Sequence, residues 1–161
     1  MEKQKTTQRR KGIDLKIGIV TSLFNSEIAK IEFDSCIKTL ENKGISKEKI
    51  LAVKVPGALE IPLALKKMAS KKEFHALVAF GVVIRGETFH FEIVSLESAS
   101  GIMSVSLDFE IPIANGILTV ENIEQAYLRA EKKGIECALV VIDMLNSLEK
   151  IKNFSYFNEQ K

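Results

Sequence analysis

The stretch A-L-V-A-F-G-V-V-I-R-G-E-T-F-H-F-E, residues 76–92, decides the fold of this chain. Residues 76–84 are all apolar or glycine, which is typical of a buried strand. The run stops at residues 85–88, R-G-E-T, and a long helical pattern follows. A strand, a Gly/Thr turn and a helix in this order leave free backbone N–H groups where the helix begins, and such groups bind anions. His90 stands beside this predicted anion site.

Apolar runs and helical patterns alternate on both sides of this stretch. We predict further strands over residues 15–20, 50–55 and 111–114. Helices are predicted from residue 26 to a cap at Gly44 and over residues 58–68, 92–107 and 121–132, with Thr119 as a candidate N-cap and Gly134 as the end of the last. Residues 136–148 fit either a strand or a helix. This alternation predicts an α/β domain with a parallel sheet.

Two details of packing follow from the helical patterns. In the helix over residues 58–68, we expect Leu59, Leu63 and Leu65 to point inward, and Pro62 is tolerated in the first turn. In the helix over residues 92–107, the small residues 98–101, S-A-S-G, predict close packing against a neighbouring element.

Length and composition predict a single domain over residues 13–150, between a basic, flexible arm (1–12) and a polar tail (151–161). Hydrophobic residues make up 46% and charged residues 27%, as in soluble globular proteins. The net charge of +2 comes from the basic arm, and the rest of the chain is slightly acidic. We therefore expect no nucleic-acid partner, because the predicted domain has no basic stripe.

We expect a cytoplasmic protein with no membrane partner. No apolar stretch reaches the roughly 18 residues that a membrane helix needs, and the N-terminus has no apolar core of a secretory signal. Cys36 and Cys137 lie in apolar patterns without metal or redox spacing, which favours buried, reduced thiols.

The residues that suggest chemistry follow the predicted strands. In a parallel sheet, ligands bind beyond the carboxyl ends of the strands. Candidates follow all four strands, and we expect them to form one site: Phe24 and Asn25; Pro56, Gly57, Ala58 and Glu60; residues 83–90; and Asn115.

Each candidate side chain has a structural and a functional interpretation. His90 is either a solvated residue at a helix start or an acid/base near neutral pH, whereas His75 lies before its strand and is expected at the surface. Glu60 either favours the helix dipole or accepts hydrogen bonds from a ligand. Phe24 is unusual in a polar loop and can stack on a planar ring. Arg129 is either solvated or a phosphate clamp.

Taken together, these motifs resemble the 6,7-dimethyl-8-ribityllumazine synthase family. The resemblance runs from about residue 16 to residue 148. It rests on Phe24-Asn25, V-P-G-A-L-E-I-P (55–62), G-V-V-I-R-G-E-T-F-H-F-E (81–92), G-I-L-T-V-E-N-I-E-Q-A (116–126) and Arg129-Ala130. It implies a flavodoxin-like α/β/α sandwich with a four-stranded parallel sheet, and makes residues 136–148 a helix.

The resemblance also implies a reaction and an assembly. The family's transferases of riboflavin biosynthesis condense 5-amino-6-(D-ribitylamino)uracil with 3,4-dihydroxy-2-butanone 4-phosphate and release phosphate and water. They need no metal or organic cofactor. They form at least homopentamers, with each active site between neighbouring subunits.

Roles for individual residues follow from the same resemblance. His90 would shuttle protons as the catalytic residue. The pyrimidine and ribityl groups would contact Phe24, Asn25, Gly57, Ala58, Glu60, Val83, Ile84 and Asn115. The phosphate would contact Gly86, Glu87 and Thr88, with Arg129 of a neighbouring subunit and, as a weaker candidate, Lys133.

Two departures from the family pattern stand out. Many members have an aromatic residue where this chain has Asn115, which puts ring stacking from the neighbouring subunit in doubt. Members that form sixty-subunit shells have a longer kinked link after the position of Ala130 than the short one expected here before Gly134. We therefore expect a pentamer, or a decamer of paired pentamers, rather than a shell.

Two other functions compete with this one. A non-catalytic lumazine- or flavin-binding protein would keep Phe24 and Glu60 without needing the anion turn and His90, which are present here. A flavodoxin-like signalling domain would need an acidic cluster after the first strand, where this chain has residues 21–25, T-S-L-F-N.

Overall fold

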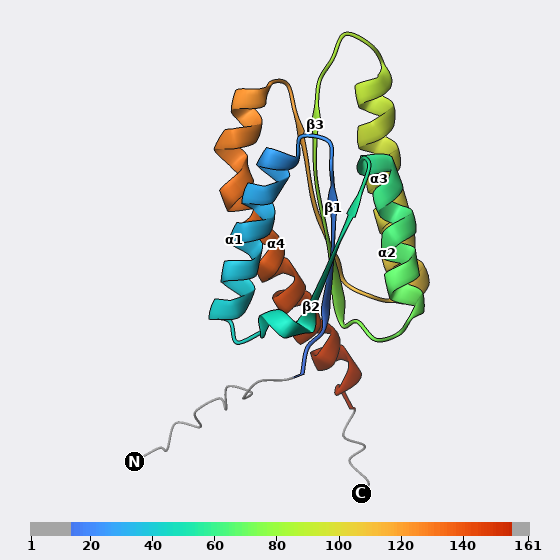
Figure 1. Cartoon of the computed structure of the whole chain (residues 1–161). Coiled ribbons are helices and arrows are strands. Elements are labelled where there is room, and N and C mark those ends of the chain that lie inside the picture. Colours follow the sequence, from blue (N-terminus) through green and yellow to red (C-terminus); the bar gives the residue numbers. More distant parts are fainter. Residues whose placement is uncertain (1–13, 156–161) are drawn as a thin grey trace, which may run out of the picture.

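The computed structural model describes residues 14–155 and shows a four-stranded parallel sheet between two pairs of helices (Figure 1). The strand order is β2-β1-β3-β4, which confirms the flavodoxin-like fold. The strands are β1 (Ile17–Ser22), β2 (Ile50–Val55), β3 (Ala76–Ile84) and β4 (Ile113–Val120). The helices are α1 (Ser26–Asn42), α2 (Ile61–Ser70), α3 (His90–Phe109) and α4 (Ile123–Lys152).

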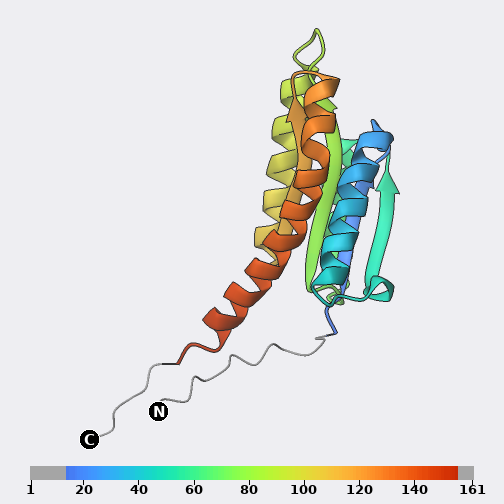
Figure 2. The same ribbon diagram turned by 90° about the vertical axis from the view of Figure 1, so that its left-hand side faces the viewer.

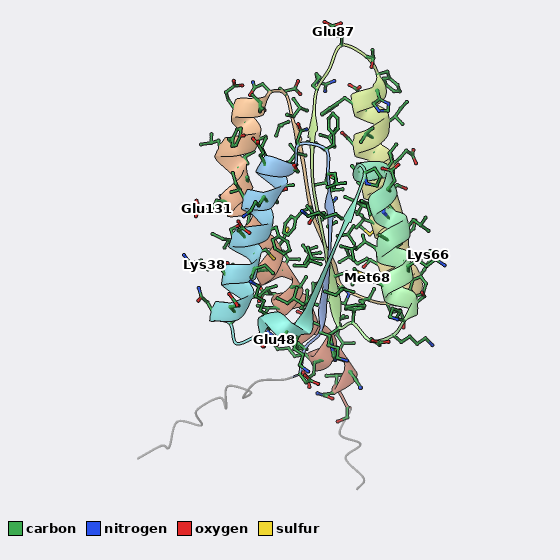
Figure 3. The ribbon with its side chains drawn as sticks, viewed as in Figure 1. Lys38, Glu48, Lys66, Met68, Glu87 and Glu131 are labelled. Carbon is green, nitrogen blue, oxygen red and sulfur yellow. The ribbon has the colours of Figure 1, made fainter. Side chains whose placement is uncertain are left out.

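The two faces of the sheet bury alternate residues of the same strand. From β3, Ala76, Val78 and Phe80 pack under α1 and α4, whereas Leu77 and Ala79 pack under α2 and α3. Met68 of α2 points toward this second face (Figure 3). Because β1 and β3 are covered on both sides, their sequences are continuous apolar runs rather than alternating ones.

Parallel pairing aligns the carboxyl ends of the strands. Ser22 of β1 pairs with Val55 of β2, and Thr21 of β1 pairs with Phe80 of β3. The segments that follow β1, β2 and β3 therefore leave the sheet at the same edge, which is also where α3 begins.

Helix α4 is one continuous helix, so the predicted end at Gly134 is wrong, and the strand-like segment 136–148 is helical. A Cβ at position 134 would lie 2.0 Å from the Glu32 carbonyl oxygen of α1. Glycine is therefore needed where two helix backbones touch, and it does not end the helix. The C-terminal turns of α4 project beyond the sheet (Figure 2). The predicted tail 151–161 thus starts inside α4, and the predicted arm 1–12 lies outside the described residues.

Strand β4 is longer than the predicted strand 111–114, and Thr119 lies in the strand rather than at a helix N-cap. The N-cap is Asn122, whose side chain accepts a hydrogen bond from the Gln125 N–H. Polar residues are tolerated because β4 is an edge strand: Asn115 and Thr119 are exposed, while Leu118 and its alternate neighbours are buried.

The α2–α3 layer confirms one packing prediction and corrects another. A Cβ at Gly101 would lie 2.6 Å from the Pro62 ring, so the small residues of α3 do allow close helix contact. Leu65 is buried, but Leu59 and Leu63 are exposed. The prediction failed for these two because the buried face of α2 is formed by Ile61, Leu65, Met68 and Ala69, and a 3-10 turn (Ala58–Glu60) precedes the helix.

Candidate active site

A cavity of about 600 Å³ opens at the carboxyl edge of the sheet. The segments after β1, β2 and β3 and the first turns of α3 line it. Its lining residues are Ser22, Phe24, Pro56, Gly57, Ala58, Leu59, Glu60, Val82, Val83, Ile84, Gly86, Thr88, His90, Phe91 and Val94. Three of the four strand ends that were expected to form one site therefore line this pocket, whereas Asn115, expected from the fourth, does not line it.

The loop after β1 presents an aromatic ring to this cavity. Backbone hydrogen bonds from the Leu23 N–H to the Val55 carbonyl (2.8 Å) and from the Phe24 N–H to the Pro56 carbonyl (3.2 Å) tie the loop to the end of β2. The Phe24 side chain is left 72% exposed, although it lines the cavity. A rigid backbone with an exposed ring suits stacking on a flat ligand.

Asn25 supports the pocket from behind and does not line it. It adopts a left-handed backbone (φ 55°), and its Nδ2 donates to the Val82 carbonyl at 3.1 Å. This bond joins the start of α1 to the end of β3. Its amide is therefore used to hold two walls of the cavity together.

The turn after β2 adds a carboxylate to the lining of the cavity. Residues Pro56 and Gly57 lead into the 3-10 turn, and the Glu60 N–H donates to the Gly57 carbonyl at 3.3 Å. A Cβ at position 57 would lie 3.0 Å from Glu60 Oε2, so the carboxylate lies close over the turn. Glu60 is exposed to the cavity and can accept hydrogen bonds from a hydroxylated ligand.

The loop 85–89 joins β3 to α3 and carries the predicted anion site. Gly86 and Thr88 line the cavity, and His90 is the first residue of α3. The Thr88 hydroxyl accepts a hydrogen bond from the His90 N–H at 3.4 Å. Glu87 lies at the tip of the loop and points away from the sheet (Figure 3). The positive end of the α3 dipole and the imidazole therefore face the same space.

The side chain of Arg85, the first residue of this loop, is bonded to other partners. Its Nε donates to Glu121 Oε2 at 2.7 Å, its Nη1 donates to Glu92 Oε1, and its guanidinium lies 4.2 Å from the centroid of the Phe91 ring. The hydrogen bonds to Glu92 and Glu121 raise the pKa of Arg85, and the bond from Arg85 lowers the pKa of Glu92.

No lysine or arginine is among the residues that line the cavity in the described part of the chain. Arg129 is exposed on α4 and donates to the Gln125 carbonyl at 3.1 Å. Lys133 pairs with Glu136 at 3.3 Å, and Asn115 lies within β4 opposite Ala79, not after the strand. One chain therefore brings together the ring, the carboxylate, the turn and the imidazole, but not the cationic residues.

Several lining residues were not predicted from the sequence, chiefly Ser22, Leu59, Val82, Phe91 and Val94. Phe91 had a signal, because it follows Phe89 and His90 in an aromatic triplet at a helix start. The aliphatic residues had none, since they look like ordinary core residues. His75 lies at the other end of the sheet, as expected, where its Nδ1 accepts a hydrogen bond from the Lys16 N–H at 3.0 Å.

Within residues 14–155, no cluster of three or more His, Cys, Asp or Glu side chains is arranged to hold a metal ion. No helix in the same range is long and apolar enough to cross a membrane. Cys36 and Cys137 are buried and free, and burial raises the pKa of both thiols to about 12.

The parallel sheet and the cavity at its carboxyl edge define a flavodoxin-like α/β protein with a pocket where proteins of this fold bind ligands. A sequence model described as 6,7-dimethyl-8-ribityllumazine synthase matches residues 14–149. The chain belongs to this family.

Curated relatives of the same description support the membership. The proteins from Burkholderia vietnamiensis and Cupriavidus necator are both 53% identical to this chain over 135 residues. These alignments cover 84% of this chain and 80% and 81% of the two relatives, respectively. A relative from Paraburkholderia phytofirmans is 53% identical over 84% of this chain and 80% of its own length.

Proposed function

We propose that the cavity condenses 5-amino-6-(D-ribitylamino)uracil with 3,4-dihydroxy-2-butanone 4-phosphate once a second copy of the chain completes it. Family membership makes the chain a transferase with lumazine synthase activity, which serves riboflavin biosynthesis. The observation that carries the assignment of residues is the gathering of Phe24, Glu60, Thr88 and His90 around one cavity.

The pyrimidine substrate would bind between the loops after β1 and β2. The Phe24 ring would stack on the heterocycle, and the Glu60 carboxylate would accept hydrogen bonds from the ribityl hydroxyls. Gly57 and Ala58 would form the floor of the ribityl pocket, with Asn25 holding its shape through Val82. The backbone at Val83 and Ile84 would contact the edge of the heterocycle.

The phosphate of the second substrate would lie at the loop 85–89. Backbone N–H groups around Gly86 and the Thr88 hydroxyl would bind its oxygens, together with the positive end of the α3 dipole. Glu87 would contribute only its backbone, since its carboxylate points away (Figure 3).

The chemistry then consists of proton transfers between two substrates held side by side. The uracil amine attacks the ketone and expels water to form an imine, and loss of phosphate followed by tautomerisation leaves a second carbonyl. The ribitylamino nitrogen then attacks this carbonyl and expels water, which closes the second ring. His90 would move the protons, an effect worth about 10²–10⁴-fold. Holding the two substrates together lowers the activation barrier by a larger amount, up to roughly 7–11 kcal/mol. His90→Ala should therefore weaken turnover without abolishing it.

A second copy is needed because residues 14–155 of one chain place no lysine or arginine in the cavity to bind a phosphate dianion. We propose that Arg129 of a neighbouring copy supplies it. Leu128 beside Arg129 is 81% exposed, and α3 exposes Leu96, Met103 and Leu107, so apolar surface is available for such contacts. Asn115 on the open face of β4 would approach the ligand ring from the neighbour. Lys133 is a poorer candidate, since it is paired with Glu136.

We propose a homopentamer rather than a shell. Two such pentamers can pair to form a decamer. The kinked link that accompanies shells has no counterpart here, because α4 is continuous from Ile123 to Lys152. Light scattering tests this proposal: a particle near a megadalton would contradict it. We propose the cytoplasm as the compartment, which the two buried free thiols favour.

Mixing two damaged variants tests whether the site is shared between copies. Turnover of the two substrates is followed by lumazine absorbance for His90→Ala, for Arg129→Ala, and for oligomers reassembled from both. Mixed oligomers contain some sites with both native residues, so their activity should exceed the mean of the two parents. His75→Ala, a histidine at the far end of the sheet, is the matched control and should match the unmodified enzyme.

Two results would count against these proposals. Absence of turnover by the unmodified enzyme would refute the proposed reaction. Mixed oligomers no more active than the mean of their parents would show that Arg129 of one copy does not complete the His90 site of another.

A further inference from the structure

We propose that Arg85 is a positioning residue that clamps the loop 85–89 and the first turn of α3, and that its guanidinium does not bind the substrate phosphate. The proposal rests on the proposed function of this cavity and deepens it. Arg85 is the first residue of the R-G-E-T stretch (85–88) that carries the predicted anion site.

The contacts of Arg85 join three separate segments. Its side chain bonds Glu121 at the junction of β4 and α4 and bonds Glu92 in the first turn of α3. Its backbone N–H donates to the Val120 carbonyl at 2.9 Å. The bond to Glu92 spans seven residues and closes the base of the loop that carries Gly86 and Thr88.

Charge argues against a direct role of Arg85 in phosphate binding. One guanidinium faces two carboxylates, so the group of three carries a net negative charge. Arg85 is also absent from the residues that line the cavity, whereas Gly86 and Thr88 line it. A phosphate at the loop would have to draw Arg85 away from both carboxylates.

The clamp acts on the reacting groups through two neighbours. Phe91 lies under the guanidinium and lines the cavity, and His90 precedes Phe91 in the same helical turn. Apart from the long bond between the Thr88 hydroxyl and the His90 N–H, few described contacts hold this loop in place. Fixing the first turn of α3 therefore fixes the imidazole relative to the anion site.

The test compares Arg85→Met, Glu121→Gln and the double variant by steady-state kinetics with both substrates. We expect Arg85→Met to lower kcat by about tenfold to a hundredfold, because small misplacements of reacting groups have effects of this size. The KM for the pyrimidine substrate should not change, since Phe24 and Glu60 lie in the segments after β1 and β2, away from the loop 85–89. The double variant should be no worse than Arg85→Met alone, because both changes break one interaction.

Conservative and control variants complete the design. Arg85→Lys keeps the charge but not the fork geometry, so it should also lose several-fold in kcat. Lys30→Met removes an exposed ion pair on α1 and should leave the kinetics unchanged. Thermal unfolding and light scattering identify the variants that fold and assemble. If Arg85→Met does not fold, Glu121→Gln still tests the clamp, because it weakens the Arg85–Glu121 contact and keeps the arginine.

Two kinetic patterns would overturn the clamp. In the first, Arg85→Met raises only the KM for the phosphate substrate while Glu121→Gln lowers it, as expected of a phosphate-binding arginine released from its partner. In the second, Arg85→Met and Arg85→Lys both match an active unmodified enzyme. Absence of turnover by that enzyme would instead refute the proposed function.

Discussion

Glu32 is a carboxylic acid buried in the fold, on α1 where it packs against α4, with neither side-chain oxygen hydrogen-bonded. Burial raises the pKa of this carboxyl to about 9, against a smaller opposing effect of Lys133. The folded protein therefore holds a proton at Glu32 at neutral pH, whereas the unfolded chain does not. Replacing Glu32 with Gln removes this difference and keeps the size of the side chain.

The sign and size of the effect follow from linkage. Because folding raises the pKa of Glu32, the contribution of this group to stability is fully present below about pH 4.5. It is lost progressively as the pH rises toward about 9. Each pH unit in this window lowers the free energy of unfolding by about 1.4 kcal/mol. At pH 7 the unmodified fold has lost about 3 kcal/mol relative to pH 4.5. Glu32→Gln should not lose stability in this way.

Urea unfolding at fixed protein concentration measures the effect. Between about pH 5.5 and about pH 7.5, the stability of Glu32→Gln relative to the unmodified protein should rise by about 3 kcal/mol. The change of this difference with pH is the decisive quantity, since any cost of burying the amide is the same at both pH values. Glu41→Gln, an exposed residue on the same helix, is the control. An equal difference at both pH values would show that Glu32 is ionised, as a partner of Lys133, and would refute the reasoning.

Two further substitutions test the packing of α4 and the aromatic wall of the cavity. Gly134→Ala should destabilise the fold by about 1–3 kcal/mol in thermal or urea unfolding, because the added methyl collides with the Glu32 carbonyl; stabilisation, as expected at an exposed helix position, would contradict the close contact. Phe24→Ala should raise the KM for the pyrimidine substrate by about tenfold, with little effect on stability, because the ring is mostly exposed. Phe24→Tyr should retain binding, Leu23→Ala is the neighbouring control, and an unchanged KM in Phe24→Ala would exclude stacking.

The strands and the location of the pocket were predictable because they depend on local patterns. The run from Ala76 to Ile84 is apolar on both sides, and only a strand covered by helices on both faces needs that pattern. Once the strands are parallel, their carboxyl ends must meet at one edge. Phe24, Glu60 and His90 could thus be assigned to one site before any coordinates.

The sequence predictions were wrong where the same residue type is compatible with different structures, depending on its neighbours in the fold. Gly134 ends many helices but here lies inside one, and Asn115-Gly116 suggests a turn but lies in an edge strand. Leu59 and Leu63 are apolar yet exposed, because the buried face of α2 is formed by Ile61, Leu65, Met68 and Ala69. Local propensity cannot distinguish these cases, since the deciding neighbour is distant in sequence.

The order of residues by itself determined a parallel α/β domain, the membership of an enzyme family and the three strand ends that surround the cavity, because hydrophobic patterning and turn chemistry act over a few residues. Only the tertiary structure decided that α4 is continuous, that Glu32 is buried without a partner, and that Arg85 bonds Glu121, which lies 36 residues away. These features depend on two backbones approaching closely or on charges meeting across elements, and such distances exist only after the chain has folded.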